Sequence, residues 1–558
     1  MKKEKTNKNG LYYLLSFLFP FAIILGVFAI NGLDLFGDQT VLIGDAGAQY
    51  YPFLMMLRQT VREGGSLLYT WKAGLGISLL PMISYYISSP LNLISILLPE
   101  GWIRVWLMLA VCIRYGIAGL SFTVMVRTIK PKLTVFAPLF GTVFALCSWT
   151  LLSYWQIIWM DTVSLTPLVL AGLIRAVRDR DYRLYPIALA VSLFCNFYIG
   201  FITCMMTGFC WIGLMIVLRK PLREIPKEAG RFIGLSVISA AMCALFFIPV
   251  LLEISNAARA NSGTLSFTRF YESLPRLLGQ FASLIFPIVN NHPPSLASSM
   301  LVLMLPLPFL TVKKIDLRER IFCFAMTCFL LFSLWYEPLN IMWHGFHFPG
   351  GTVDRFAYLV PLMLAYMGWR YTECLAEEKV SVRELIVSLL LTLPLPVLVL
   401  ICAAKVGSTD IPLVSALYVA LYLGLYGLRI AKPQKRGWFT AGLVLMVIGE
   451  VALNSYSHVM RQSYTNPYLV KNEYIDAAAQ KIKSEWDPMR VSRTGVASLN
   501  SFGNFELLLG VPCGSSSFNS LNKRDLQEMC IMLGFEHAHD SCYYKYHAAS
   551  PLIAQLLN

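Results

Sequence analysis

The strongest constraint on the fold is the recurrence of long apolar segments along the chain. Runs of about 17 to 25 mostly apolar residues follow one another, and an α-helix needs this length to cross about 30 Å of hydrocarbon. Of the 558 residues, 56% are hydrophobic and 14% are charged. A soluble chain of this size could not bury so much apolar surface. The sequence therefore predicts an all-α polytopic membrane protein.

The apolar segments predict a domain organisation. We expect about thirteen transmembrane helices, near residues 11–31, 101–126, 133–153, 158–175, 184–198, 201–218, 232–252, 298–312, 320–336, 355–372, 384–404, 411–428 and 437–455. Residues 1–455 would form the transmembrane domain. The more polar residues 456–558 would form a small α/β segment. The first span follows lysines without a cleavage pattern, which indicates that it is retained.

The basic residues predict an orientation. Alternate loops hold about three times as many Lys and Arg residues as the loops between them, in clusters at residues 2–8, 127–132, 175–183, 219–231, 313–320, 370–383 and 429–436. By the positive-inside rule these clusters are cytoplasmic, so the N-terminus lies inside and the C-terminal segment outside. The net charge of +14 is thereby explained without nucleic acid, because no basic run alternates with stacking aromatic residues.

Residues 82–99 are apolar enough to cross the membrane, but a span there would invert every later loop. We expect this segment to be interfacial or re-entrant, since Pro90 interrupts it. The amphipathic residues 48–62 predict a second membrane-lying helix. Residues 32–100 then form a first extracytoplasmic loop far longer than an ordinary connection, which favours a functional role.

The segment "GDAGAQYYPF", residues 44–53, opens this loop with a carboxylate. One interpretation is that Asp45 caps a helix N-terminus. The other is catalytic: a carboxylate near hydrocarbon is partly desolvated, and Asp45 would act as a general base. Gln49 and Tyr50 lie one helical turn further on and would bind substrate beside it.

Two further outward segments carry candidate residues. In "YWQIIWMD", residues 154–161, Trp159 suits a membrane interface or a substrate surface. Asp161 begins a span, where it would favour the helix dipole or serve as a second catalytic carboxylate. In "NFYIG", residues 196–200, Asn196 and Tyr198 are candidates for substrate binding, although Asn196 is also an ordinary turn residue.

A third outward segment, "NIMWHGFHFPGGTVDRFAYL", covers residues 340–359 and contains His344, His347, Asp354 and Arg355. Arg355 offers a planar fork of donors suited to phosphate, or it is a snorkelling interface residue. Arg259 is a lesser candidate of the same kind. The histidine pair is a weak zinc signal without a further ligand, so no metal ligand is assigned, and assistance by a divalent metal stays open.

Two charged residues lie within predicted spans. Arg114 is near the middle of the second span and Glu450 lies in the last one. Charges at such depth are costly and mark a functional or a paired site. Arg114 is assigned to substrate binding, although a structural role, as partner of a polar group in the bundle, stays open. For Glu450 the sequence leaves a structural and a functional role open.

Together, "GDAGAQYYPF", "SYYISSPLNLISILLP", "WQIIWMDTVSLTPLVLAGL", "NFYIGF" and "WHGFHFPGGTVDRFAYL" resemble, in this order, the bacterial YfhO family of membrane proteins. The resemblance extends over residues 10–558 and implies a GT-C-like glycosyltransferase with an early catalytic acid in its long first outward loop. Asp45 matches that acid, and Asp161, His344 and Arg355 match other outward polar positions. Family members usually continue further, which implies that this chain is truncated.

The resemblance implies a function at the outer face of the bacterial cytoplasmic membrane. A sugar would pass from a polyprenyl-phosphate donor, supplied by a separate polyprenyl-phosphate glycosyltransferase, to a cell-envelope acceptor such as lipoteichoic acid. One inverting displacement would use Asp45 as the base. The alternatives are a transporter or flippase of a lipid-linked envelope precursor, whose key polar groups belong at the midplane, and a non-catalytic envelope-assembly scaffold.

Overall fold

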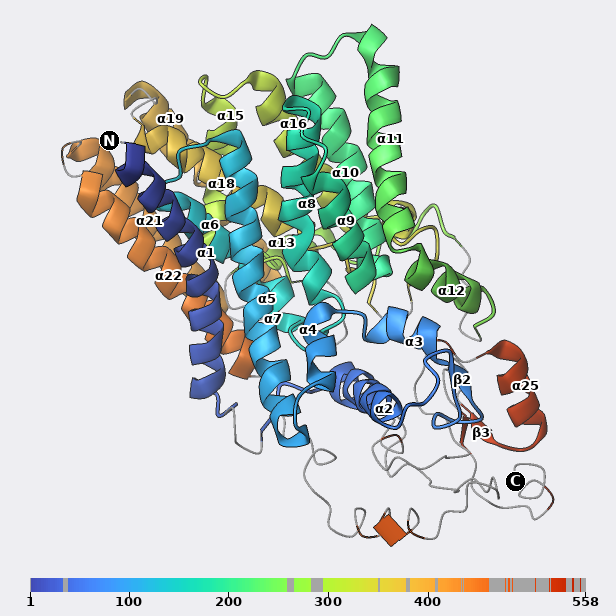
Figure 1. Ribbon diagram of the computed structural model, residues 1–558. Helices are drawn as coiled ribbons and strands as arrows, with labels where there is room; N and C mark the ends of the chain where they lie inside the picture. Colours follow the sequence, from blue (N-terminus) through green and yellow to red (C-terminus); the bar gives the residue numbers. More distant parts are fainter. Residues whose placement is uncertain are drawn as a thin grey trace.

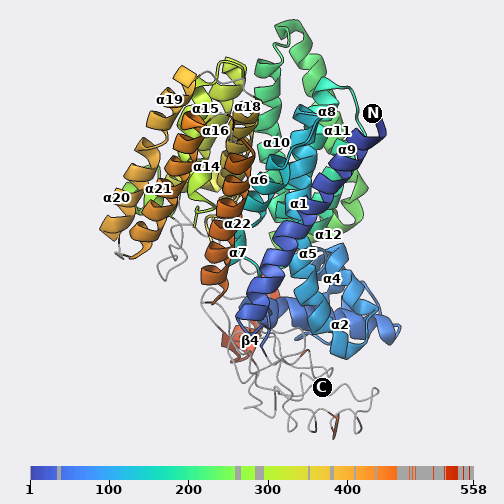
Figure 2. The same cartoon turned by 90° about the vertical axis from the view of Figure 1, so that its left-hand side faces the viewer.

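A computed structural model describes most of the chain: residues 2–33, 39–257, 265–282, 295–349, 352–377, 382–406, 410–432, 434, 436–460, 521, 523–537 and 544–545, with isolated residues between 477 and 552. The described part is a bundle of helices that run mainly along one direction, with smaller elements gathered at one end (Figure 1). The view turned by 90° shows the same arrangement (Figure 2).

The first loop folds into short elements at that end of the bundle (Figure 1). It follows α1 (Lys2–Ile30) and consists of η1 (Ala46–Tyr50), α2 (Tyr51–Arg62), β1 (Tyr69–Thr70), β2 (Ile77–Ser78), α3 (Leu79–Tyr86), α4 (Pro90–Leu93) and η2 (Ile94–Ile96). Strands β1 and β2 pair antiparallel. The apolar stretch of α3, α4 and η2 is bent by 116°, with Pro90 as the first residue of α4. The predicted break at Pro90 is therefore confirmed.

The bundle follows. Its first half contains α5 (Glu100–Ile129), α6 (Phe136–Ala145), α7 (Ser148–Leu152), α8 (Met160–Arg178), α9 (Leu184–Cys195), α10 (Phe197–Val217), η3 (Leu222–Glu224), α11 (Ile225–Met242) and α12 (Ala244–Ser255). Its second half contains α13 (Leu274–Gly279), α14 (Met300–Met304), α15 (Pro306–Thr311), α16 (Leu317–Trp335), α17 (Glu337–Trp343), α18 (Leu359–Ala376), α19 (Val382–Leu391), α20 (Pro394–Val406), α21 (Asp410–Ala431) and α22 (Arg436–Met460).

Within the described residues, six helices are long and apolar enough to cross a membrane, or up to eight if each of two bent pairs is one span. The expected thirteen spans stay a prediction. Three expected spans are not straight helices: residues 133–153 divide into α6 and α7, residues 298–312 into α14 and α15, and residues 232–252 bend by 83° between α11 and α12. In the second case the physical reason is Pro306, which has no N–H to continue the helix.

The C-terminal segment is described only in part. Helix α25 (Arg524–Met532) precedes strands β3 (Glu536–His537) and β4 (Tyr544–Lys545), which pair antiparallel. The Tyr544 hydroxyl accepts a hydrogen bond from the Leu75 backbone N–H at 2.8 Å. This contact places the described part of the C-terminal segment against the first loop, as Figure 1 also shows.

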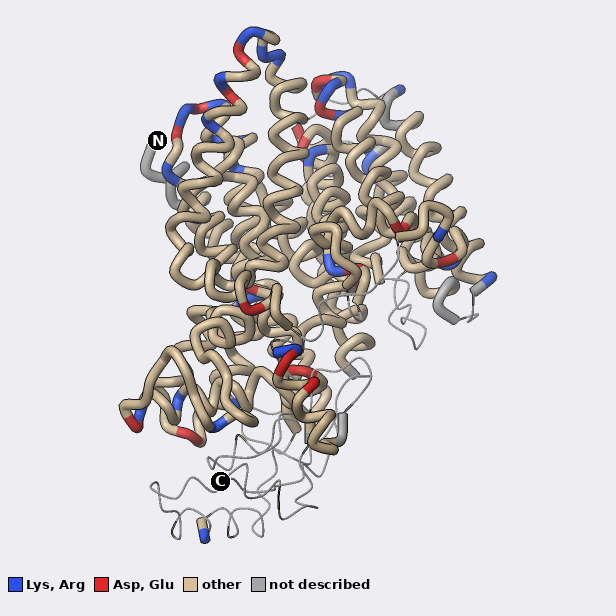
Figure 3. The backbone as a smooth tube through the Cα atoms, turned by 90° about the vertical axis from the view of Figure 1, so that its right-hand side faces the viewer, with Lys and Arg blue, Asp and Glu red and all other residues tan. Residues whose placement is uncertain are grey.

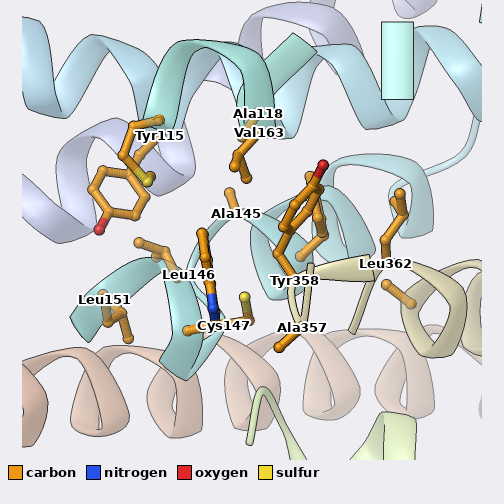
Figure 4. Packing of buried hydrophobic residues seen from close by; sticks show 14 of the residues in the cluster. Tyr115, Ala118, Ala145, Leu146, Cys147, Leu151, Val163, Ala357, Tyr358 and Leu362 are labelled. Atoms are coloured by element: carbon orange, nitrogen blue, oxygen red, sulfur yellow. The ribbon is translucent and has the colours of Figure 1, made fainter. Parts of the chain in front are cut away.

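Helix α5 is the centre of the core and packs against α1, α6 and α8. Small residues allow the close approach: a Cβ atom at Gly119 of α5 would lie 2.3 Å from the Ser16 carbonyl oxygen of α1, and one at Gly141 of α6 would lie 2.7 Å from the Gly119 carbonyl oxygen. Such contacts are typical of helix packing in membranes. In Figure 4, Tyr115 of α5, Val163 of α8 and Tyr358 beside α18 lie in one buried cluster.

Charged side chains divide between the two ends of the bundle. The basic loops between α8 and α9 and between α10 and α11 lie at the end opposite the first loop (Figures 1 and 3). The middle of the bundle is mostly uncharged in Figure 3. The first loop and the basic loops thus lie on different sides of the apolar layer.

Candidate active site

The Asp45 carboxylate immediately precedes η1, a π-helical turn of a kind frequent at functional sites. Its side chain makes no capping hydrogen bond to the helix. The Gln49 Nε2 atom donates to Asp45 Oδ1 at 2.9 Å, and Gln156 Nε2 donates to Oδ2 at 3.3 Å. The capping interpretation is therefore wrong, whereas the expected contact with Gln49 is confirmed.

The Tyr50 hydroxyl extends this cluster by donating a hydrogen bond to Gln156 Oε1. Burial and the neighbouring charge of Asp45 raise the pKa of Tyr50 well above its ordinary value. The phenol therefore stays protonated and orients Gln156 toward Asp45. The charge of Arg355 lowers the same pKa, so Arg355 lies within electrostatic reach of this cluster.

Arg355 lies on an aromatic platform formed by two distant segments. Its guanidinium carbon is 5.2 Å from the centre of the Trp159 ring and 4.5 Å from that of Tyr198. Cation–π contacts of this kind hold a guanidinium in place while its edge can still donate hydrogen bonds. The structure thus brings together three residues that the sequence assigned separately.

His344 is a buried neutral residue that connects Tyr198 to the backbone of Val353. The Tyr198 hydroxyl lies 2.7 Å from His344 Nδ1, and His344 Nε2 lies 3.0 Å from the Val353 carbonyl oxygen. Because that carbonyl can only accept, Nε2 carries the proton and Nδ1 accepts from the tyrosine. Burial lowers the pKa of His344 to about 3, and Arg355 acts in the same direction. His344 therefore positions Tyr198 as an uncharged group.

Asp354 is a buried carboxyl that immediately precedes Arg355. Its Oδ1 atom has no hydrogen-bond partner among the described residues. Its backbone carbonyl accepts from Trp149 Nε1 at 3.1 Å, and Trp149 stacks on Trp159 with ring centres 6.4 Å apart. Burial raises the pKa of Asp354 to about 7, against the effects of its own N–H and of Arg355.

Arg114 and Asp161 form a separate, closed cluster. Arg114 Nε donates to Asp161 Oδ2 at 2.9 Å, and the two side chains are 0% and 7% exposed. Arg114 Nη2 also donates to Ser89 Oγ at 3.0 Å and to Asn92 Oδ1 at 2.7 Å. The pair therefore ties the first turns of α4 and α8 to α5. This geometry tests neither the substrate-binding role predicted for Arg114 nor the role of second catalytic carboxylate predicted for Asp161.

Two other predicted polar residues hold helix ends. Asn196 Oδ1 accepts the Ile199 N–H at 2.8 Å and caps α10. Glu450 accepts hydrogen bonds from Ser299 Oγ at 2.5 Å, the Met300 N–H at 2.7 Å and the Tyr422 hydroxyl at 2.7 Å. For Glu450 these contacts favour the structural role, because they join the start of α14 to α21 and α22.

The remaining predictions concern Arg259 and a metal. Arg259 lies outside the described residues. His347 is exposed, and no group of three His, Cys, Asp or Glu side chains in the described part of the chain could hold a metal ion.

Gln156 is a site residue that the sequence did not predict, although Gln156 lies in the same segment as Trp159, residues 154–161. Its amide gave no sign of a contact 111 residues away.

Apolar helices of membrane-crossing length, with a polar cluster at one end of the bundle, define a polytopic membrane protein. The chain belongs to the family described as bacterial membrane protein YfhO, whose model matches residues 16–558. No curated protein matches the chain.

Solved glycosyltransferase structures show a distant likeness. The arabinofuranosyltransferase AftD from Mycobacteria has a TM-score of 0.46 and 14% identity over 86% of this chain, which spans 28% of AftD. Apo ArnT from Cupriavidus metallidurans has a TM-score of 0.45 and 12% identity, over 88% of this chain and 84% of ArnT. ArnT bound to undecaprenyl phosphate has a TM-score of 0.41 and 12% identity, over 91% and 86% of the two chains. Scores below 0.5 at such identities do not by themselves establish a shared fold.

Proposed function

We propose that the protein is a membrane glycosyltransferase that moves a sugar from a polyprenyl-phosphate donor to a cell-envelope acceptor. The observation that carries this proposal is the approach of two unlike groups at one end of the bundle. Asp45 is held by two neutral amides, and Arg355 lies within electrostatic reach of the same cluster. A base and an anion-binding group are what this transfer requires.

The transfer would occur as a single displacement. Asp45 takes the proton of the acceptor hydroxyl while the oxygen of that hydroxyl forms a bond to the anomeric carbon. The bond from that carbon to the phosphate oxygen breaks, and its electron pair stays on the lipid phosphate. Arg355 stabilises that charge with its planar fork of donors. One carboxylate is sufficient because the leaving group is already an anion, unlike in glycosidases.

The remaining groups support these two. Gln49, Gln156 and Tyr50 orient the carboxylate, while Trp159, Tyr198 and His344 hold the guanidinium. We assign Arg114 and Asp161 to positioning, because each largely balances the charge of the other. The site would face the outside, since the basic loops lie at the opposite end of the bundle, and residues 456–558 would form an outer segment beside it.

A transporter or flippase remains the competing function. The bend of 83° between α11 and α12 favours it, because broken helices are common in transporters. The position of the Asp45 and Arg355 clusters at one end of the bundle favours the enzyme, since transporter sites lie near the midplane.

The test uses the purified protein in lipid vesicles, a radiolabelled polyprenyl-phosphate sugar and envelope acceptors. We expect transfer by the wild-type protein and a loss of about 10²- to 10⁴-fold in Asp45→Asn, the range for removal of a general base. Glu272→Gln is the matched control, since Glu272 lies outside the first loop and is paired with Arg276. Undiminished transfer in Asp45→Asn excludes the proposed base. Movement of the labelled lipid across the bilayer without transfer would indicate a flippase.

A further inference from the structure

Two arginines of α2 meet the chain just before α5, and a third lies one turn into α5. Arg58 Nη2 and Arg62 Nη2 both donate to the Leu98 carbonyl oxygen, at 3.1 and 3.4 Å. Arg104 lies in the second turn of α5. Arg58 and Arg104 both act on the electrostatics of the buried Tyr51 phenol, which indicates that the positive charges gather around one place.

Arg58 and Arg62 together carry more positive charge than Glu100, the acidic side chain that pairs with Arg58. Glu100 Oε2 lies 3.8 Å from Arg58 Nη1, and the Glu100 side chain is 74% exposed, so solvent weakens the pair. Arg58 is only 6% exposed, and its Nε atom has no hydrogen-bond partner among the described residues. Burial and the nearby Arg62 lower the pKa of Arg58. An anion bound here would relieve both the desolvation and the repulsion.

The surroundings of the cluster are those of a membrane surface. Leu98 and Glu100 lie at the start of α5, which is a candidate membrane span. Large apolar side chains beside them face outward: Leu97 is 82% exposed and Trp102 is 54% exposed. Tryptophan at a span end is typical of the boundary between hydrocarbon and headgroups. The phosphates of lipids lie at that depth.

We propose that Arg58, Arg62 and Arg104 bind the phosphate of an anionic phospholipid headgroup and hold the first loop against the membrane surface. Guanidinium groups suit this ligand, because their planar forks donate several hydrogen bonds to phosphate oxygens. Leu97 and Trp102 would contact the acyl chains of the same lipid. This site is independent of the proposed sugar transfer and would exist whether or not the protein is an enzyme.

The test measures lipid retention by the full-length protein. The protein is purified from vesicles that contain equal amounts of phosphatidylglycerol and phosphatidylcholine, and the bound lipids are counted by native mass spectrometry. We expect the wild-type protein to retain phosphatidylglycerol preferentially. Each arginine near a charged lipid contributes about fivefold in affinity, so Arg62→Gln with Arg104→Gln should lower that preference about 30-fold. These two positions are chosen because Arg58 is buried and its replacement could impair folding.

Arg276→Gln is the matched control, since Arg276 lies in α13 and is paired with Glu272 at 3.3 Å. It should retain phosphatidylglycerol like the wild-type protein. Equal retention of both lipids by the wild-type protein, or an unchanged preference in the double variant, overturns the proposal. Displacement of phosphatidylglycerol by soluble polyglycerol phosphate at the same concentration also overturns it, because the site would then take a polymer rather than a lipid.

Discussion

Two clusters in this protein combine a carboxylate with a guanidinium, and they differ in how their charges are met. In the closed cluster, Asp161 and Arg114 contact each other at 2.9 Å and are almost fully buried. In the open cluster, Asp45 is held by neutral amides and Arg355 lies over two aromatic rings. Asp45 and Arg355 are both partly exposed.

The difference indicates that one cluster has a structural role and that the other is suited to act on a substrate. In a buried ion pair each charge balances the other, and the pair fixes the elements that carry the two side chains. A carboxylate that accepts hydrogen bonds from amides and a cation that lies over π faces are oriented by these contacts, and their partial exposure lets each meet a substrate. We infer that the closed cluster builds the frame on which the open cluster is placed, because Asp161 and Trp159 are only two residues apart in the chain.

The largest effect is expected from breaking the closed cluster. Asp161→Asn leaves Arg114 buried without its counter-charge, and removal of one partner of such a pair typically costs about 3–5 kcal/mol of the free energy of unfolding. The measurement is thermal unfolding of the detergent-solubilised protein beside Asp45→Asn, which keeps one side-chain acceptor oxygen and should cost no more than about 1.5 kcal/mol.

If Asp161→Asn is as stable as the wild-type protein and yet loses sugar transfer, Asp161 belongs to the chemistry and the distinction between the clusters fails. The paired replacement of Arg114 and Asp161 by Met and Leu is the control for charge, since it removes both partners. It should be less destabilising than Asp161→Asn alone.

The contrast between these clusters also explains what the sequence could predict. The contact of Asp45 with Gln49 lies within one helical turn, and spacing alone predicts it. The break before α4 follows from Pro90, whose ring and missing N–H interrupt a helix locally. The apolar segments likewise predict where most helices lie, because each must match the thickness of the membrane.

The sequence could not predict contacts between distant segments. Gln156 reaches Asp45 across 111 residues, and Arg114 reaches Asp161 across 47. The first pair depends on how the first loop lies against the connection between α7 and α8, and the second on how α5 and α8 pack. One sequence reveals neither arrangement. The division of residues 133–153 and 298–312 into short helices was missed for a related reason: inside a bundle, neighbouring helices and side chains satisfy the freed backbone groups.

The pH dependence of stability reports whether Asp354 is neutral or ionised in the folded protein. The pKa of Asp354 is about 7 in the folded protein, above the value of about 3.9 for an unfolded aspartate. The folded protein keeps a proton that the unfolded chain loses, so Asp354 should lower the free energy of unfolding by about 1.4 kcal/mol per pH unit between about pH 4 and 7. His344, whose pKa is about 3 in the folded protein and about 6.5 in an unfolded chain, contributes the opposite slope below about pH 6.5, so the Asp354 contribution is measured against a variant that lacks it. The stability of Asp354→Asn relative to the wild-type protein should therefore rise by about 1.4 kcal/mol per pH unit between about pH 4 and 7, and the variant should be the more stable of the two at pH 8.

Thermal unfolding from pH 5 to pH 8 measures the slope. A stability difference between the wild-type protein and Asp354→Asn that does not change with pH over this range would mean that Asp354 is ionised in the folded state. Asp354 would then be a second open carboxylate beside Arg355, and the two clusters would differ less than their geometry indicates.

The smallest expected effect tests the open cluster itself. Arg355→Lys keeps the positive charge but loses the planar fork and the stacking on Trp159 and Tyr198. Loss of one bidentate contact should raise the KM for the polyprenyl-phosphate donor about tenfold, equivalent to about 1.4 kcal/mol, and also lower kcat, because the same fork stabilises the leaving phosphate. Arg276→Lys, in the pair with Glu272, should leave both constants unchanged. If Arg355→Lys behaves like this control, the guanidinium serves only to pack against its two rings, and the open cluster retains a base without an anion-binding partner.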